Sequence, residues 1–407
     1  MKILFLTHYY PPEVNAPANR VHEHARVWVR EGHEVTVVTG VPNHPRGEIF
    51  PGYENRWFQE EEIEGVRVLR TWMYITANEG FFRRTLNYVL FAITAVFAAM
   101  RADRPDVVVA TSPQFFVGLA GAVVSRLRRR PFVLEVRDLW PDSIVQLGQM
   151  KRGLGVKILE LLETALYRSA AGIVVVTRSF EAHIRRRGID PDRISLIYNG
   201  IDVAKFHPRP ANQELLREHG LEGQYLIAYV GTLGLAHGLP TVLSAAAMLR
   251  DRKELTFLFI GDGADRARLE GLAKEQGLDN VRFLGLQPRE AIPDWLASID
   301  LLLVMLRDLE VFHTVIPSKL FEFLAQERPV VLAAKGETRE MVLATEAGWV
   351  IDPEDPDQLA EVIDQIRAQP EEAERRATAG REWVEREFRR DDLALRMAGF
   401  LESVCRR

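Results

Sequence analysis

The sequence predicts an α/β protein made of two doubly wound parallel sheets in tandem. Short runs rich in Val, Ile and Leu alternate with segments whose apolar residues recur every three or four positions. Continuous apolar strands separated by helices are typical of parallel sheets covered on both faces. The alternation stops once, between residues 199 and 210, where turn residues replace the periodic pattern, and then restarts. We therefore expect two Rossmann-like domains joined near residue 200.

The expected strands of the first domain are Ile3–Thr7, Glu34–Thr39, Val66–Trp72, Val107–Thr111, Phe132–Val136, Gly172–Thr177 and Ile194–Tyr198. Those of the second domain are Tyr225–Val230, Leu255–Gly261, Val281–Leu284, Leu301–Leu306, Val330–Ala333 and Trp349–Ile351. We expect the domains to span 1–200 and 201–387, with a C-terminal helix at about 388–407 returning to the first. Ligands of such folds bind at the carboxyl ends of the strands, here in a cleft between the domains.

Composition excludes several classes of site. The single cysteine, Cys405, excludes an intrachain disulfide and a cysteine-rich metal site. No His, Cys and Asp cluster has metal-ligand spacing, so we expect no metal and no cofactor. The apolar run after Met1 is shorter than the roughly 7 to 15 residues of a signal peptide. We therefore expect a cytoplasmic protein.

Charge is unevenly distributed along the chain. Residues 1–200 hold 26 Lys and Arg against 21 Asp and Glu, whereas the remainder holds 26 against 36. The basic excess indicates either solvated helix ends or an anionic surface or ligand. The uncharged segment Thr85–Met100 is shorter than the about 20 residues that span a bilayer. It predicts a buried helix, or one that meets the inner face of the plasma membrane through the preceding residues, which are Phe81, Phe82, Arg83 and Arg84.

The stretch Phe312–Ala325 has two interpretations. In one, Ser318 caps a helix, Glu322 completes a capping box and Lys319 faces solvent. In the other, Lys319 shares a bound anion with the helix N-terminus, and Glu322 binds sugar hydroxyls. The local sequence does not separate them.

Further candidates follow the expected strands. After the first strand, small residues open a helix where a phosphate could approach, at Ala16, Asn19 and Arg20. Asp138 comes directly off a strand and is a candidate catalytic carboxylate, whereas Asp142 is explained as a helix cap. The Gly261–Gly263 turn is a weak signal for ligand binding.

These residues resemble a known family. The two-domain layout and the runs Gly231–Gly238, Phe259–Gly263, Val281–Gly285 and Lys319–Glu322 look like a family 4 retaining glycosyltransferase of GT-B fold. More narrowly, the chain resembles the WbuB-like branch, which adds sugars such as acetamido-fucose during surface polysaccharide assembly. The runs that carry this likeness are His8–Glu13, Thr39–Pro45, Arg137–Pro141 and Thr314–Lys319.

The resemblance implies a role for each site residue. Glu322 would contact the donor ribose, backbone amides between Ile316 and Leu320 the diphosphate, and Asp138 the sugar. Lys319 would neutralise the leaving diphosphate, so that no metal is required. The donor-binding set implied is Glu322, Ser318, Thr314, Pro317, Gly231, Thr232, Gly261, Gly263, Gly285, Leu286 and Leu320.

Three positions depart from the family pattern. Thr314 stands where a first Glu is usual, and Thr232 and His237 stand where the second domain usually carries Arg or Lys. Phosphate neutralisation must therefore rest on Lys319, on helix dipoles or on an arginine such as Arg20.

The expected activity is retaining transfer of a sugar from a nucleotide-diphosphate donor, UDP-linked, to a lipid-diphosphate-linked saccharide in surface polysaccharide biosynthesis. An acetamido-deoxy sugar such as N-acetylfucosamine is one candidate. Two alternatives stay open, a nucleotide-sugar epimerase and a non-catalytic donor-binding subunit. A dehydrogenase is disfavoured because GxGxxG is absent.

Overall fold

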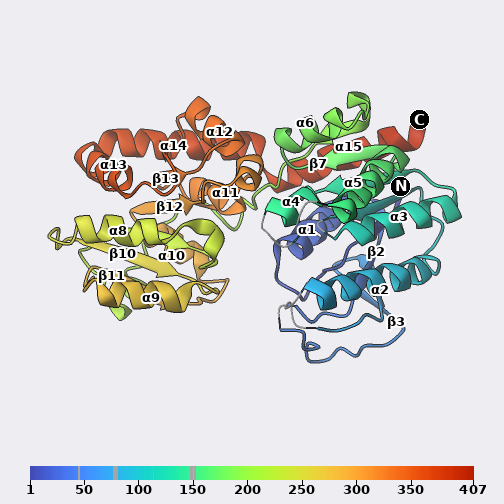
Figure 1. The fold of residues 1–407 in the computed structure, drawn as a ribbon, viewed down its shortest axis with the longest axis horizontal. Coiled ribbons are helices and arrows are strands. Elements are labelled where there is room, and N and C mark those ends of the chain that lie inside the picture. Colours follow the sequence, from blue (N-terminus) through green and yellow to red (C-terminus); the bar gives the residue numbers. More distant parts are fainter. Residues whose placement is uncertain (45, 77–80, 113, 147–149, 151–152) are drawn as a thin grey trace. The chain divides into compact units, whose positions relative to one another are not determined.

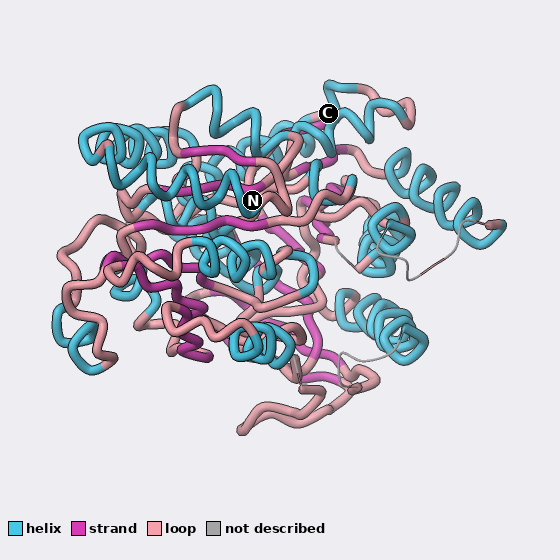
Figure 2. Tube along the Cα trace, turned by 60° about the vertical axis from the view of Figure 1, so that its left-hand side comes forward, coloured by secondary structure: helices cyan, strands magenta, loops and turns pink. Residues whose placement is uncertain are grey.

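The chain folds into two compact units (Figure 1). The structure, a computed structural model, describes residues 1–44, 46–76, 81–112, 114–146, 150 and 153–407. Unit 1 comprises Met1–Asn199 and Arg390–Arg407, and unit 2 comprises Gly200–Arg389. In both units the strands form the interior and the helices cover them (Figure 2).

Unit 1 contains an eight-stranded sheet in the order β3-β4-β2-β1-β5-β6-β7-β8. Its strands are β1 (Lys2–Leu6), β2 (Glu34–Gly40), β3 (Phe58–Ile63), β4 (Val66–Thr71), β5 (Val107–Thr111), β6 (Phe132–Val136), β7 (Gly172–Val175) and β8 (Ile194–Leu196). All neighbours pair in parallel except β3, which is antiparallel to β4. The parallel sheet confirms the predicted fold class.

Strand β3 is not predicted by the sequence pattern. It lies at the sheet edge and is rich in glutamate, so it lacks the apolar run used to find the other strands. Glu64 and Gly65 both have positive φ, as a two-residue hairpin turn requires. Cross-strand pairs of Glu60 with Arg67 and of Glu61 with Arg70 add to this hairpin.

The helices of unit 1 are α1 (Ala16–Arg30), α2 (Phe81–Ala99), α3 (Phe115–Arg128), α4 (Asp142–Gln146), α5 (Leu154–Ser169), α6 (Arg178–Arg186) and α15 (Arg390–Arg406). The C-terminal helix α15 packs against α1, as expected. The Trp28 indole donates a hydrogen bond of 2.8 Å to the Ala394 carbonyl, and Arg390 forms a 2.6 Å ion pair with Glu23. These contacts attach the last helix to the first.

A buried ion pair ties α1 to the sheet of unit 1. The Arg20 guanidinium donates to Glu135 Oε1 at 2.8 Å and to the carbonyls of Tyr198 and Ile197 at 2.6 and 3.0 Å. Both charged side chains are almost fully buried. A buried charge is tolerated only when it is paired and hydrogen-bonded. This contact therefore holds α1, strand β6 and the segment that follows β8 in fixed positions.

Unit 2 contains a six-stranded, fully parallel sheet in the order β11-β10-β9-β12-β13-β14. The strands are β9 (Tyr225–Val230), β10 (Leu255–Ile260), β11 (Val281–Gly285), β12 (Leu301–Met305), β13 (Val330–Ala333) and β14 (Trp349–Ile351). The helices are α7 (Gln213–Glu218), α8 (Pro240–Met248), α9 (Arg266–Glu275), α10 (Ile292–Ser298), α11 (Ser318–Ala325), α12 (Glu337–Thr345), α13 (Pro356–Ala368) and α14 (Pro370–Glu387).

Helix α11 is held in place by close packing against α14. A Cβ at Gly380 of α14 would lie 2.7 Å from the Leu324 side chain and 3.2 Å from the Ala347 carbonyl oxygen, so glycine leaves room for this close approach. Phe321 stacks on Phe388, with ring centroids 4.4 Å apart. The N-terminus of α11 is thereby fixed at the carboxyl edge of the sheet.

Among the residues that the structure describes, no helix is both long and apolar enough to cross a bilayer. Within the same residues, no three His, Cys, Asp or Glu side chains group as a metal site would need.

We predict that Arg20→Ala destabilises unit 1 by about 3–5 kcal/mol, because Glu135 would stay buried without its partner. Arg26 pairs with Glu64 on the surface, so Arg26→Ala should cost less than about 1 kcal/mol. Chemical denaturation of the two variants measures the difference. Equal losses would contradict the structural role of the buried pair.

Candidate functional site

Three loops at the carboxyl edge of unit 2 are joined by backbone hydrogen bonds. Gly231 N donates to Ile260 O at 2.8 Å, and Gly261 N donates to Gly285 O at 2.8 Å. The loops after β9, β10 and β11 therefore run side by side. Leu286, which follows β11, is exposed beside them, as is Thr232.

Two glycines make this arrangement possible. Gly261 has φ +139°, and a Cβ there would lie 2.0 Å from Gly231 O. A Cβ at Gly263 would lie 2.3 Å from Leu233 O. The Gly261–Gly263 turn thus needs glycine in order to pack against the neighbouring loop.

The Lys319 amino group is the charged centre of this edge. It lies 3.9 Å from the centroid of the Tyr229 ring, and a Cβ at Gly231 would be only 2.6 Å from it. Nζ is buried and, among the described residues, has no hydrogen-bond partner. The interpretation of Lys319 as a solvent-facing residue is therefore wrong.

Burial of this amino group sets the electrostatics of the site. It lowers the pKa of Lys319 to about 7, and the nearby Glu322 carboxylate opposes that shift. His237 stays neutral at pH 7, because burial and the neighbouring Lys319 lower its pKa to about 4. A lysine with three N–H donors and no acceptor is suited to an anionic ligand.

The start of α11 corrects one expectation about Ser318. Ser318 is the first helical residue and is exposed, whereas Pro317 occupies the N-cap position without a side-chain cap. The predicted capping role of Ser318 is therefore wrong. The first N–H groups of a helix lack intrahelical acceptors, so they and Lys319 point to the same kind of ligand.

The segment that leads into α11 is also fixed. Thr314 ends a short 3-10 helix (Glu310–Thr314), and its hydroxyl donates to Val311 O at 2.9 Å. Thr338 Oγ1 donates to Val315 O at 2.8 Å. A Cβ at Gly336 would lie 2.1 Å from His313 O. Thr314 is thus half-buried and engaged locally at the position where the family usually has Glu.

Glu322 lies one turn into α11 and is half-buried. Its charge acts on Lys319 and on Lys205 of the same unit. Leu320, by contrast, is fully buried, so only its backbone could meet a ligand. Gly285 has φ +69° and lies close to the Arg266 guanidinium.

In unit 1, Asp138 lies at the carboxyl edge of the sheet, after β6. The Ser143 hydroxyl donates to its carboxylate at 3.2 Å, and Ser112 Oγ accepts its backbone N–H at 3.2 Å. Asp138 and Trp140 line a cavity of about 20 Å³, room for one water molecule. Burial raises the pKa of Asp138.

The expected phosphate residues near α1 do not form a site together. Arg20 is committed to Glu135 and two carbonyls, so the prediction that it binds phosphate is corrected to a structural role. The α1 N-terminus at Ala16 is capped by Asn15, whose side chain accepts from Ala18 N at 2.9 Å. Asn19 is half-buried on the same helix.

The loop after β1 meets the loop after β2, a contact that the sequence did not predict. Glu13 is buried and accepts hydrogen bonds from the backbone of Asn43 and His44, each 2.9 Å long. Burial raises the pKa of Glu13. His8 packs between the rings of Tyr9, Tyr88 and Phe91. Glu13 lies in the loop after β1, and its partners are 30 and 31 residues further along the chain, so a local pattern does not identify the contact.

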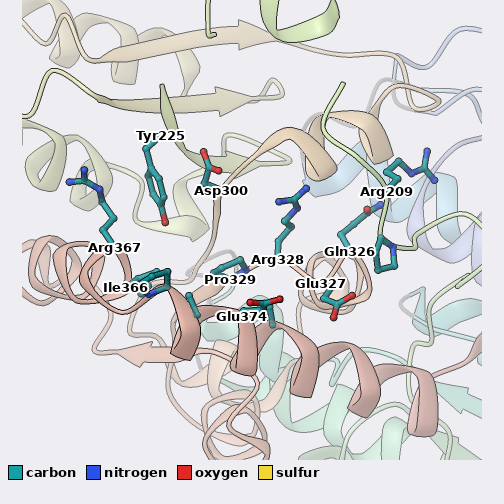
Figure 3. A pocket seen from close by; sticks show the side chains of 14 residues that line it. Arg209, Tyr225, Asp300, Gln326, Glu327, Arg328, Pro329, Ile366, Arg367 and Glu374 are labelled. Carbon is teal, nitrogen blue, oxygen red and sulfur yellow. The ribbon is translucent and has the colours of Figure 1, made fainter. Parts of the chain in front are cut away.

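A larger cavity of about 470 Å³ lies at the other end of unit 2 (Figure 3). Tyr225 at the start of β9 lines it, together with Asp300 and Pro329, which precede β12 and β13. These are the amino ends of the strands. Since ligands of doubly wound folds bind at the carboxyl ends, we place the candidate site around Lys319 instead.

Family models match both halves of the chain. Residues 15–200 match a glycosyl transferase 4-like domain, and residues 212–383 match the glycosyl transferases group 1 domain. The chain belongs to this glycosyltransferase family.

Curated relatives of this glycosyltransferase include two bacterial proteins. The putative colanic acid biosynthesis glycosyl transferase WcaI of Escherichia coli is 28% identical over 97% of this chain and 98% of its own. The probable glycosyltransferase WbjE of Pseudomonas aeruginosa is 28% identical over 65% of this chain and 67% of its own.

Solved structures share the fold of the glycosyltransferase. Sucrose-phosphate synthase from Thermosynechococcus elongatus has a TM-score of 0.76 at 20% identity, covering 99% of this chain and 98% of its own. HepE of Anabaena, in complex with UDP-glucose, has a TM-score of 0.72 at 18% identity, covering 99% and 100%. At these identities the likeness establishes the two-domain GT-B architecture alone.

We predict that Gly261→Ala lowers the stability of unit 2 by about 2–4 kcal/mol, because Cβ would collide with backbone and φ is positive. Gly271 lies in the exposed interior of α9 with nothing near its Cβ, so Gly271→Ala should stabilise by about 0.5–1 kcal/mol. Denaturant midpoints measure both. A neutral Gly261→Ala would contradict the packing described for the turn.

Proposed function

We propose that this glycosyltransferase moves a sugar from a UDP-linked donor to a lipid-diphosphate-linked saccharide in surface polysaccharide biosynthesis, with retained anomeric configuration. The donor diphosphate is assigned to Lys319 and the first N–H groups of α11. The single observation that carries this assignment is the buried Lys319 amino group, which has no described hydrogen-bond partner and lies at a helix N-terminus.

The comparisons support the donor and the pathway only as properties of other proteins. HepE was solved with UDP and with UDP-glucose, and the name of WcaI assigns it to colanic acid biosynthesis. Membership of the glycosyltransferase family favours transfer over the epimerase and the non-catalytic subunit. An acetamido-deoxy sugar such as N-acetylfucosamine remains part of the proposal.

The charged event of the reaction is departure of the diphosphate. The bond between the anomeric carbon and the phosphate oxygen breaks, and a bond to the acceptor hydroxyl oxygen forms on the same face. The acceptor proton passes to the departing phosphate oxygen. Lys319 and the α11 N–H groups would stabilise the developing negative charge, as an oxyanion hole does. This chemistry needs no metal, since protein donors supply the neutralisation.

Glu322 and Asp138 have distinct proposed roles. Glu322 would accept hydrogen bonds from the ribose hydroxyls, one helical turn from the lysine that holds the phosphates. Asp138 would steady the oxocarbenium-like sugar or orient the acceptor hydroxyl. Thr314 is uncharged, whereas the family usually has a glutamate here that contacts the donor sugar. The threonine suits a donor sugar with fewer hydroxyl groups.

We predict that UDP affinity falls as pH rises above about 7. Below that pH Lys319 is already protonated, whereas above it binding must take up a proton, because the diphosphate raises the lysine pKa. The expected loss approaches about tenfold per pH unit. Isothermal titration calorimetry between pH 7.5 and 8.5, where the phosphates are almost fully ionised, measures it.

The matched variant is Lys319→Met, which should bind UDP weakly at pH 7 and show a flat profile above it. His237, with a pKa near 4, does not titrate in this range. A wild-type profile without slope, or the same slope in Lys319→Met, would exclude Lys319 as the diphosphate ligand.

We predict that Glu322→Ala weakens UDP binding by about tenfold to a hundredfold, because hydrogen bonds to a charged carboxylate are lost. Pyrophosphate, which lacks a ribose, should lose much less affinity, because it feels only the smaller change at Lys319 that follows loss of the Glu322 charge. Glu340→Ala on the exposed surface of α12 is the control. Equal losses of affinity for UDP and pyrophosphate would show that Glu322 does not contact the ribose.

A panel of UDP-sugars with and without a polyprenyl-diphosphate saccharide tests the reaction itself. We expect transfer only when both substrates are present, and Asp138→Asn should lower kcat while UDP affinity stays constant. NMR of the product reports whether the anomeric configuration is retained. A new sugar formed from donor alone would favour epimerisation and overturn the proposal.

A further inference from the structure

Helix α5 exposes a row of apolar side chains while it buries one carboxylate. Its inward face buries Glu163, which accepts a 2.6 Å hydrogen bond from the Tyr167 hydroxyl. Its outward face exposes four large apolar side chains, Leu154, Ile158, Leu161 and Leu162, spaced to form one stripe. Leu161 retains 71% of its accessible surface. Packing within unit 1 does not explain this stripe.

Helix α2 also exposes apolar side chains, although Phe91 and several alanines make up most of its buried face. Asn87 and Thr94 are buried, and the Thr94 hydroxyl donates to Trp72 O at 2.8 Å. The outward stripe consists of Leu86, Ile93, Phe97 and Met100, and Phe97 is 70% exposed. These positions are separated by seven, four and three residues, so they share one side of the helix.

Helix α3 connects the two stripes. It lies between α2 and α5 and packs against both (Figure 1). Val123 and Leu127 are exposed on it. Arg128 ties its end to the end of α2 by donating to Ala99 O and Ala102 O at 2.9 and 2.6 Å. Of the eighteen large apolar side chains exposed among the described residues, nine lie on these three helices, and Met100 directly follows α2.

The charge on this surface, here called the α2–α3–α5 face, is basic. Helices α2 and α3 contain no Asp or Glu in their sequences but carry Arg83, Arg84, Arg126 and Arg128. On α5, Lys157 and Arg168 are exposed, Glu160 is half-buried and Glu163 is buried, so two cations and one carboxylate meet the surface there. An apolar face edged with cations is complementary to an anionic bilayer surface.

We propose that the α2–α3–α5 face docks on the surface of a membrane containing anionic lipid, with its apolar side chains in the interface. A second copy of the chain fits less well, because an isologous contact would bring the basic edges together. The surface extends well beyond the predicted anchor at Phe81–Arg84. The side chains of Phe81 and Phe82 lie outside the described residues, and the proposal does not use them.

This inference rests on the proposed function in one respect: docking would bring the enzyme to its lipid-linked acceptor. Its test requires no substrate. If docking fails, the transferase proposal is untouched, and if transfer fails, docking can still be observed.

Vesicle flotation of the full chain tests the proposal. The wild-type chain should float with phosphatidylcholine vesicles containing phosphatidylglycerol and less with phosphatidylcholine alone, and high salt should weaken the binding. The double substitution Phe97→Glu with Leu161→Glu should lower vesicle binding by about tenfold or more, since two apolar side chains that would enter the bilayer interface are lost.

The control is Leu343→Glu with Leu395→Glu, which adds the same charge at exposed apolar positions on α12 and α15. It should float like the wild type. Arg126→Gln with Lys157→Gln should reduce binding severalfold on the anionic vesicles only. Circular dichroism confirms that each variant is folded.

Three results would overturn the proposal. The first is a folded wild-type chain that does not float with anionic vesicles. The second is an equal loss of vesicle binding in Phe97→Glu with Leu161→Glu and in Leu343→Glu with Leu395→Glu. The third is light scattering that shows a dimer which Phe97→Glu with Leu161→Glu converts to a monomer without any lipid binding. In that case the face joins two copies of the chain.

Discussion

The carboxyl edge of unit 2 depends on one costly feature, a lysine amino group held out of water. Lys319 Nζ is placed against the Tyr229 ring and over Gly231, where any side chain would collide with it. Position 261 must also be glycine, because a Cβ there would lie 2.0 Å from the carbonyl oxygen of Gly231. Burial without a hydrogen bond is unfavourable for an ammonium group, so a bound anion is the ligand that would stabilise this arrangement.

The same geometry offers a physical account of the departures from the family pattern. The loop after β9 carries Thr232 and His237, and His237 is neutral at pH 7. The Lys319 side chain on α11 reaches the same loop at Gly231, and in our proposal it supplies the cation there. Electrostatic stabilisation depends on where a charge lies and not on which element supplies it. Our proposal for diphosphate binding follows from this substitution.

Unit 1 combines two uses of buried polar groups. Arg20 and Glu135 form a paired and hydrogen-bonded contact that joins α1 to the sheet. Glu163 is buried on α5, where low solvent exposure raises its pKa to about 7. The first arrangement orders the fold, whereas the second leaves the outer side of α5 to apolar residues. The exposed apolar side chains of α2, α3 and α5 together form a patch of a kind that soluble proteins rarely expose unless it binds a partner or a membrane.

The sequence alone determined the fold class, because continuous apolar strands and periodic helices are local patterns that tertiary contacts did not override. It also placed Lys319 and Glu322 on the correct helix. It missed β3, whose glutamates are neutralised by arginines on β4, and it assigned Arg20 to phosphate because its partner Glu135 is 115 residues away. Only the tertiary structure decided that Lys319 is buried, that Ser318 does not cap α11, and that apolar stripes on three helices form one face. Each of these depends on which distant residues meet, and a local pattern does not contain that information.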